Sequence, residues 1–228
     1  MKEHLQHLDT RPLPLEREWT VEGIPVLRLT GSLPQPVGKP SRALRRIQRY
    51  YQHQAKCYLR YCQRFLLPLA VEAHRAALAC SAPLPLCTAV LGYEITCNEG
   101  GIWSLYTESR EVCGSEVSAV RRGDTWDLAV GCPIPLSACF PRRCPLRKTL
   151  LSAAAEEIRQ REALGIARWR EDWQLQLRRS FNRENFFLTP EGVCCFWQMY
   201  ALAPAEMGCP GFLLPYGEGG CRFPGTAG

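Results

Sequence analysis

Apolar residues recur with helical spacing in the first third of this 228-residue chain. From Ser41, a residue type favoured at helix N-caps, apolar positions return every three or four residues as far as Leu66. Pro68 is expected to kink or break this helix, and a second helical stretch continues to Cys80. Residues 146–163 repeat the pattern, and aromatic or leucine side chains every four residues predict a short helix over 169–181.

Alternating apolar and polar residues predict strands between and after these helices. The short connections, such as Asn98-Glu99-Gly100-Gly101 and Thr189-Pro190-Glu191-Gly192, require antiparallel neighbours. The expected strands are residues 19–30 with a bend at Glu22-Gly23, 89–97, 102–112, 115–121, 125–130, a hairpin over 185–200 and a strand over 212–216.

These elements predict an α+β protein with antiparallel sheets, packed helices and two interlocked modules. Residues 31–40 contain three prolines and two glycines, and we expect a loop there. The predicted organisation is a flexible tail over 1–18, an N-terminal α+β module over 19–144, a C-terminal module over 145–218 and a disordered tail over 219–228.

Composition places the chain among globular proteins, with 46% hydrophobic and 22% charged residues. It contains no run of about 18 apolar residues of the kind that spans a membrane. The polar N-terminus lacks the apolar segment of a secretory signal. We therefore expect a cytoplasmic location.

Thirteen cysteines make the chain cysteine-rich, yet no Cys-x-x-Cys pair occurs. Zinc-ribbon and thioredoxin-type sites are therefore not indicated. In a cytosolic protein we expect reduced thiols that pack as small apolar groups. The alternative is a disulfide-linked exported domain, in which the adjacent Cys194 and Cys195 would not pair because they point to opposite faces of a strand.

The end of the chain resembles the RsiV-like family, the bacterial lysozyme-sensing anti-sigma factors whose related modules accompany peptidoglycan deacetylases. The resemblance covers residues 19–218. It rests on Asp127-Leu128, Gly131, Leu136 and Phe140 in the N-terminal part, and on Asn185, Phe186, Leu188, Thr189, Gly192, Phe196, Tyr200, Ala203, Pro204, Gly208, Pro215 and Tyr216 in the C-terminal part.

The resemblance implies a stand-alone member with the family's fold. The family's Gly-Gly-Ala-His segment corresponds here to Val112-Cys113-Gly114-Ser115-Glu116, and its tyrosine–acid pair corresponds to Tyr200-Ala201. The polar groups of those motifs are therefore missing, and the resemblance implies the fold more firmly than lysozyme sensing.

A basic helix is the first candidate binding site, because the net charge of +6 is concentrated near the N-terminus. No acidic residue occurs between Ser41 and Arg64, and four tyrosines are interleaved with the cations. Such a surface can bind an acidic protein or an anionic polymer, or nucleic acid through phosphates and stacked bases. The alternative is a solvated outer helix face. The candidate residues are Arg42, Arg45, Arg46, Arg49, Lys56 and Arg60.

A loop shaped by proline and glycine over residues 200–212 is the second candidate. Its candidate binding residues are Tyr200, Pro204, Met207 and Phe212. The alternative is a structural corner in which the same side chains support the sheet.

We find no nucleophile motif, phosphate-binding loop, paired carboxylates or complete metal-ligand set in the sequence. We therefore predict a non-enzymatic binding or regulatory protein without a metal or cofactor. A peptidoglycan- or carbohydrate-related accessory or enzyme module, and nucleic-acid binding through residues 41–64, remain alternatives.

Overall fold

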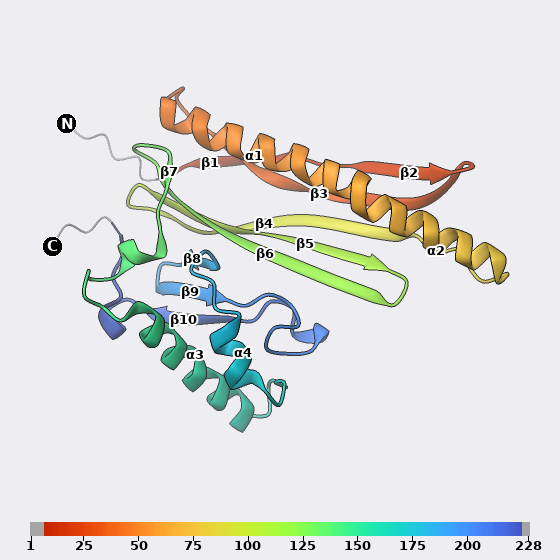
Figure 1. Cartoon of the computed structure of the whole chain (residues 1–228). Helices are drawn as coiled ribbons and strands as arrows, with labels where there is room; N and C mark the ends of the chain where they lie inside the picture. Colours follow the sequence, from red (N-terminus) through yellow and green to blue (C-terminus); the bar gives the residue numbers. More distant parts are fainter. Residues whose placement is uncertain (1–6, 225–228) are drawn as a thin grey trace. The chain divides into compact units, whose positions relative to one another are not determined.

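The computed structural model describes residues 7–224 and confirms the predicted α+β class (Figure 1). The helices are α1 (Arg42–Tyr61), α2 (Leu67–Ala79), α3 (Leu146–Ala163) and α4 (Trp173–Arg179), with a π-helix over Cys62–Leu66 and short 3₁₀ turns over Leu136–Cys139, Ala205–Met207 and Glu218–Gly220. The strands are β1 (Asp9–Pro14), β2 (Arg17–Val21), β3 (Ile24–Val37), β4 (Cys87–Glu99), β5 (Ile102–Cys113), β6 (Glu116–Asp127), β7 (Cys132–Pro133), β8 (Phe186–Leu188), β9 (Gly192–Phe196) and β10 (Gly211–Pro215).

Two sheets contain these strands. The larger has the order β1-β3-β4-β5-β6-β7, with β2 also pairing β3, and the smaller has the order β10-β9-β8. The predicted hairpins β2–β3, β4–β5, β5–β6 and β8–β9 are present. The pairing of β3 with β4 was not predicted. These two strands run parallel, and the long connection through α1 and α2 joins them.

The chain forms two compact units that are interleaved in sequence. Within the described residues, unit 1 comprises 7–8, 94–107 and 120–224, and unit 2 comprises 9–93 and 108–119. Strands β4, β5 and β6 each contribute residues to both units. The module boundary proposed at residue 144 stays a prediction.

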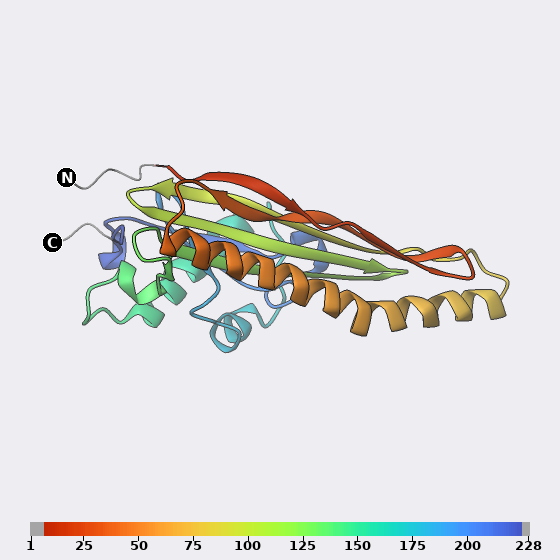
Figure 2. The same ribbon diagram turned by 90° about the horizontal axis from the view of Figure 1, so that it is seen from above.

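Unit 2 has a core of aliphatic and small residues. Its α1 helix runs along β3 (Figure 2), and Ser41 caps the helix by accepting a 3.0 Å hydrogen bond from the Leu44 amide, as predicted. The helix buries one face against the sheet, because its apolar positions have helical spacing. The buried core residues are Leu15, Val26, Leu27, Leu29, Leu33, Ala55, Cys62, Ala70, Cys87, Ala89 and Leu91.

Unit 1 has an aromatic core around Trp197. The Trp197 ring packs at 5.4 Å on Phe212 and at 6.2 Å on Phe181, and its indole nitrogen donates to the Leu177 carbonyl at 3.2 Å. Helices α3 and α4 cover the β8–β10 sheet, and α3 contributes Leu150, Ala154 and Ile158 to the core (Figure 1). The aromatic spacing over 169–181 thus predicted α4 correctly, although that helix is shorter than expected.

The predicted tail over 1–18 and the predicted loop over 31–40 are wrong where the structure describes them. Strands β1 and β2 occupy residues 9–14 and 17–21, and β3 continues to Val37. Prolines are tolerated because Pro12 faces Pro34 in the β1–β3 register, and alternate positions direct the missing N–H away from the partner strand. Residues 1–6 lie outside the described residues.

Glycine explains two further departures from the sequence pattern. At Gly31, φ is +137° and a Cβ would lie 1.9 Å from the Leu91 carbonyl oxygen, so only glycine lets β3 continue beside β4. The predicted turn at 122–124 lies within β6, where a Cβ at Gly123 would lie 1.7 Å from the Phe186 carbonyl oxygen. This glycine admits a close backbone neighbour rather than a turn.

Pro68 interrupts the long helix as predicted, through a π-helix rather than a break. Leu67 donates its backbone N–H to the Cys62 carbonyl, which is a five-residue spacing, and Pro68 lies in the first turn of α2. The pyrrolidine ring cannot accommodate the carbonyl of the preceding turn, and the wider turn removes that clash.

The disordered tail predicted over 219–228 is wrong for its first part. Cys221 is 2% exposed and belongs to the unit 1 core, and the Arg222 amide donates to the Cys139 carbonyl at 2.9 Å. Residues 225–228 lie outside the described residues.

The expectation of reduced thiols throughout is also wrong. Cys87, at the start of β4, forms a disulfide with Cys113 at the end of β5, so the hairpin is closed across its open end. The other cysteines are free, including the adjacent Cys194 and Cys195, which do not pair. No helix in the range 7–224 combines the length and apolar character that a membrane-spanning segment needs.

Candidate functional site

All the predicted basic residues of α1 lie on one exposed face of the helix. We call this surface the basic face: Arg42, Arg45, Arg46, Arg49, Lys56, Arg60 and, in the π-helix, Arg64. At about 100° of rotation per residue these positions fall within an arc of roughly 100°. The residues buried against the sheet lie on the opposite side: Ala43, Leu44, Ile47, Tyr51 and Ala55. The structure therefore brings the predicted cations together in a single row.

Most charges of the basic face, with Arg46 left aside, are not neutralised by an ion pair in the described part of unit 2. In the described chain, Arg42, Arg45, Arg49, Lys56, Arg60 and Arg64 take part in no ion pair, whereas Arg46 has another interaction. The first turn of α1 contains no acidic residue. Cations at a helix N-terminus oppose the helix dipole, so this arrangement lowers helix stability slightly.

Three of the four tyrosines interleaved with these cations contact the sheet. Tyr51 is buried, and Tyr58 and Tyr61 donate to the Glu111 carboxylate of β5 at 3.2 and 2.9 Å. Burial, and then the neighbouring Glu111, raise the pKa of Tyr61 to about 12. Tyr51 and Tyr58 are thus held on the sheet side of the helix, whereas Tyr61 keeps 36% of its surface exposed.

The 200–212 loop presents some of its predicted binding residues and buries one. Tyr200 is 48% exposed and has φ +67°, a left-handed conformation that is uncommon outside glycine. Pro204 is exposed and Met207 is half-buried. Phe212 is 3% exposed, packs on Trp197 and Trp169, and lies under the Arg161 guanidinium. Phe212 is therefore part of the core and is unavailable for binding.

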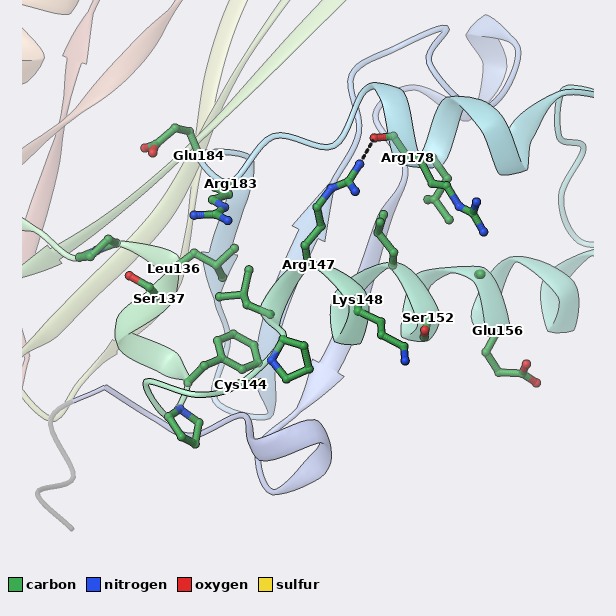
Figure 3. Close-up of a pocket in the computed structure, with 18 of the residues that line it drawn as sticks. Leu136, Ser137, Cys144, Arg147, Lys148, Ser152, Glu156, Arg178, Arg183 and Glu184 are labelled. Atoms are coloured by element: carbon green, nitrogen blue, oxygen red, sulfur yellow. Dashed lines mark hydrogen bonds between the residues drawn. The ribbon is translucent and has the colours of Figure 1, made fainter.

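Unit 1 also contains a groove that was not predicted. It has a volume of approximately 1430 Å³, is open to solvent, and lies between the 135–148 segment, the outer side of α3 and the α4 region up to Glu184 (Figure 3). The apolar surface that the groove exposes comes from Pro141, Pro145, Leu146 and Leu151, while buried core residues such as Phe140 and Trp173 lie beneath it. Its volume exceeds the range of about 300–1,000 Å³ that is usual for small-molecule sites.

Basic residues dominate the polar lining of this groove. They are Arg142, Arg147, Lys148, Arg159, Arg178 and Arg183, against the acids Glu156 and Glu184. Arg159 forms an ion pair with Glu156 at 2.9 Å, so its charge is compensated. Within the described residues no carboxylate pairs with Arg142, Lys148, Arg178 or Arg183. The uncompensated charge is thus concentrated near the first turn of α3.

Arg147 is held in place by the end of α4. Figure 3 shows its side chain extending from α3 toward Arg178, where Nη2 donates to the backbone carbonyl at 2.7 Å. Its guanidinium also lies 6.0 Å from the centre of the Phe181 ring. The remaining guanidinium N–H groups keep a fixed position beside the groove, so less conformational entropy is lost when they bind.

A local signal for the groove exists in the sequence. The segment Pro141-Arg142-Arg143-Cys144-Pro145-Leu146-Arg147-Lys148 has four cations and no acid. Summing charge over the whole C-terminal region conceals this cluster, because acids elsewhere balance it. Arg178 and Arg183 follow it by 30 and 35 residues, and only the packing of α4 on α3 adds them to the same surface.

The chemistry of the remaining candidate groups is limited. Among residues 7–224 no group of three or more His, Cys, Asp or Glu side chains could hold a metal ion. His53 lies 3.3 Å from the Cys57 thiol, and these two side chains alone do not form a metal site. Burial raises the pKa of the Cys139 and Cys194 thiols to about 12. Cys113 is disulfide-bonded. The thiols of Cys139 and Cys194 are therefore poor nucleophiles, and Cys113 has no free thiol.

The part of unit 1 that contains α3, α4 and the β8–β10 sheet matches a known domain family. Residues 145–217 match the family described as "Protein of unknown function (DUF3298)". No curated protein matches the chain.

Two solved structures of this family have the same fold. One is a DUF3298 member from Bacteroides fragilis NCTC 9343, with a TM-score of 0.66 and 14% identity over 94% of this chain and 92% of that chain. The other is a DUF3298 family protein from Pseudomonas aeruginosa PAO1, with a TM-score of 0.58 and 16% identity over 91% of this chain and 90% of that chain. At these identities they show the fold alone, and the RsiV-like relationship stays a prediction.

Proposed function

We propose that the chain is a non-enzymatic binding protein whose partner is a linear anionic polymer bound along the basic face of α1. The observation that carries the proposal is the alignment of seven basic residues in one exposed row, opposite the buried face of the helix. At 1.5 Å per residue the row from Arg42 to Arg64 is about 33 Å long. This length suits an extended polymer better than a compact ligand.

The cost of this arrangement to the helix also supports a binding role. A helix that served only to cover the sheet would gain from acids in its first turn and from opposite charges four residues apart. α1 has neither, because no acid occurs in the helix. The uniform sign of the charge therefore has no structural benefit that would explain it.

The position of the tyrosines favours recognition of charge over recognition of bases. Tyr51 and Tyr58 lie on the sheet side, so the basic face offers mainly electrostatic contacts to a polymer backbone. Nucleic acid is therefore the alternative partner, and its binding is measured beside that of polyphosphate.

The disulfide bears on where such a partner would be met. A bond between Cys87 and Cys113 persists in an oxidising compartment and would be reduced in most cytosols. An exported location is thus the alternative to the predicted cytoplasmic one. Alkylation in denaturant without reduction, followed by intact mass measurement, separates the two: two protected cysteines are expected outside the cytosol, and thirteen reactive thiols inside it.

The binding proposal is tested with labelled polyphosphate as the probe and fluorescence anisotropy as the measurement. Replacing Arg45, Arg46 and Arg49 by Glu should weaken binding by about tenfold or more, because attraction becomes repulsion at three adjacent positions. The slope of log affinity against log salt concentration should fall by about 2 to 3, since each lost phosphate contact contributes about 0.7–0.9.

The matched control carries the same charge change in unit 1. Arg168, Arg179 and Arg222, which are exposed and do not line the groove of unit 1, should leave polyphosphate affinity within about twofold when replaced by Glu. Orthophosphate should not compete at the same phosphate concentration, because it cannot contact the whole row. Equal loss in both triple variants would show a response to net charge alone and would refute the proposal. Duplex DNA and polyglutamate, measured in parallel, identify which polymer chemistry is preferred.

A further inference from the structure

We propose that the groove of unit 1 binds an acidic peptide segment of a partner protein, with a carboxylate held beside the first turn of α3 and apolar side chains on the groove walls. This site is separate from the basic face of α1 in position, shape and ligand. It does not depend on the function proposed for that face.

The charge of the groove identifies the sign of the ligand. Arg142, Lys148, Arg178 and Arg183 line it without a carboxylate partner in the described chain. The paired Arg159 and Glu156 lie two to three helical turns further along α3. The potential is therefore most positive at the Arg147–Lys148 end, and an anionic group is favoured there.

The start of α3 adds backbone donors at the same end. Pro145 occupies the N-cap position and supplies no side-chain cap, and the first turn contains Arg147 and Lys148 but no acid. The Leu146 amide donates to the Cys144 carbonyl at 2.8 Å, and the Arg147 and Lys148 amides that follow have no acceptor within their own helix. Together with the positive end of the helix dipole, they favour a carboxylate in the place that an acidic capping residue normally fills.

Arg147 has a prepared geometry for a carboxylate. Its hydrogen bond to the Arg178 carbonyl uses Nη2 and fixes the guanidinium plane. A planar guanidinium held in this way binds carboxylates through charge-assisted hydrogen bonds, which are about twice as strong as neutral ones. This hydrogen bond restrains the otherwise exposed Arg147 side chain beside the groove.

The size and the apolar walls of the groove select a peptide over a small anion. A volume of approximately 1430 Å³ accommodates several residues, and a single phosphate or acetate would contact only one end of it. Pro141 and Pro145 are exposed and Leu151 is half-buried in the groove lining, so they offer apolar surface that an inorganic anion cannot use. A segment that alternates acidic and apolar residues in extended form matches both features.

The test uses a short fluorescein-labelled peptide that alternates Glu and Leu, and an otherwise identical peptide that alternates Gln and Leu. We expect the Glu peptide to bind and the Gln peptide to bind at least about tenfold more weakly, since loss of one charge-assisted contact is worth a factor of ten or more. The variant Lys148→Glu/Arg183→Glu should weaken the Glu peptide by about tenfold or more. Neither side chain has a partner in the described chain, so the fold should be retained.

The control Arg11→Glu/Arg75→Glu changes the net charge equally in unit 2, outside the basic face, and should leave Glu-peptide affinity unchanged. Arg147→Glu is a second groove variant, and circular dichroism verifies that it folds. Equal binding by wild type and both groove variants would overturn the proposal. It would also be overturned if orthophosphate displaced the Glu peptide at comparable concentration, because the groove would then hold a lone anion. A negative result with the Glu peptide would not affect the polyphosphate test of the basic face, because the two tests use different probes, different units and different variants.

Discussion

The two compact units differ in how they are stabilised and in how their charged surfaces are built. Unit 2 has a core of leucines and small residues with a disulfide between β4 and β5, and its cations form a row on one helix. Unit 1 has a core of large aromatic rings and buried free thiols, and its cations come from three segments around a groove.

This difference shows what each surface can do. A row of exposed cations acts through long-range attraction, so its binding weakens steeply as salt screens the charges. A groove with apolar walls and a fixed guanidinium adds short-range contacts, which salt affects less. The same excess of Lys and Arg thus predicts polymer binding in one unit and peptide binding in the other.

The largest expected effect lies in the aromatic core of unit 1. Replacing Trp197 by Ala removes a side chain that is 1% exposed, together with its hydrogen bond to Leu177. We expect the free energy of unfolding to fall by about 3–5 kcal/mol, as for other buried Trp truncations. Urea unfolding measures the loss, and hydrogen exchange shows where amide protection decreases.

Leu29→Ala is the matched truncation in unit 2, because Leu29 is fully buried in the other core. Each variant should reduce amide protection mainly in its own unit. If Trp197→Ala lowers protection equally in β2 and β3, the two units unfold together and the contrast between their cores has no thermodynamic consequence.

The second effect concerns the disulfide of unit 2. Replacing Cys87 and Cys113 by Ala should lower the free energy of unfolding by about 3 kcal/mol, because the unfolded chain loses a cross-link that closes a loop of 26 residues. Unfolding followed in urea should shift to lower denaturant concentration. Wild type in reductant should behave like the double variant, whereas reductant should not alter the double variant itself.

Much of the fold followed from local pattern, and the failures have identifiable causes. The helical spacing of apolar residues predicted α1, α3 and α4, and the alternation of apolar and polar residues with short turns predicted the hairpins. The missed strands β1 and the end of β3 contain prolines, and only the register Pro12↔Pro34 shows that their absent N–H groups face away from the partner. Gly123 resembled a turn residue, whereas it makes room for the backbone at Phe186. Such contacts are set by tertiary packing.

The candidate sites divide in the same way. The row on α1 was predictable because one helix places residues three and four apart on one face. Phe212 was assigned to a binding loop, yet the sheet turns it into the core beside Trp197. The groove escaped prediction because Lys148 and Arg183 share a surface only after α4 packs on α3.

The smallest expected effect tests whether unit 2 holds its tyrosines on the sheet side of α1. The pKa of Tyr61 is about 12, raised first by burial and then by Glu111. An unfolded chain loses this proton near pH 10, so the stabilising contribution is complete below pH 10 and is lost as pH rises toward 12. Glu111→Gln removes the charge and leaves the burial. The pKa of Tyr61 should therefore fall part of the way to its ordinary value, and stability should decline less steeply above pH 10. Tyrosinate absorbance, taken as the difference between each protein and its Tyr61→Phe version, assigns the titration to this residue.

An unshifted titration in Glu111→Gln would mean that Tyr61 does not contact the carboxylate. The aromatic rings of α1 would then be available to a ligand, and base stacking by unit 2 would again have to be considered.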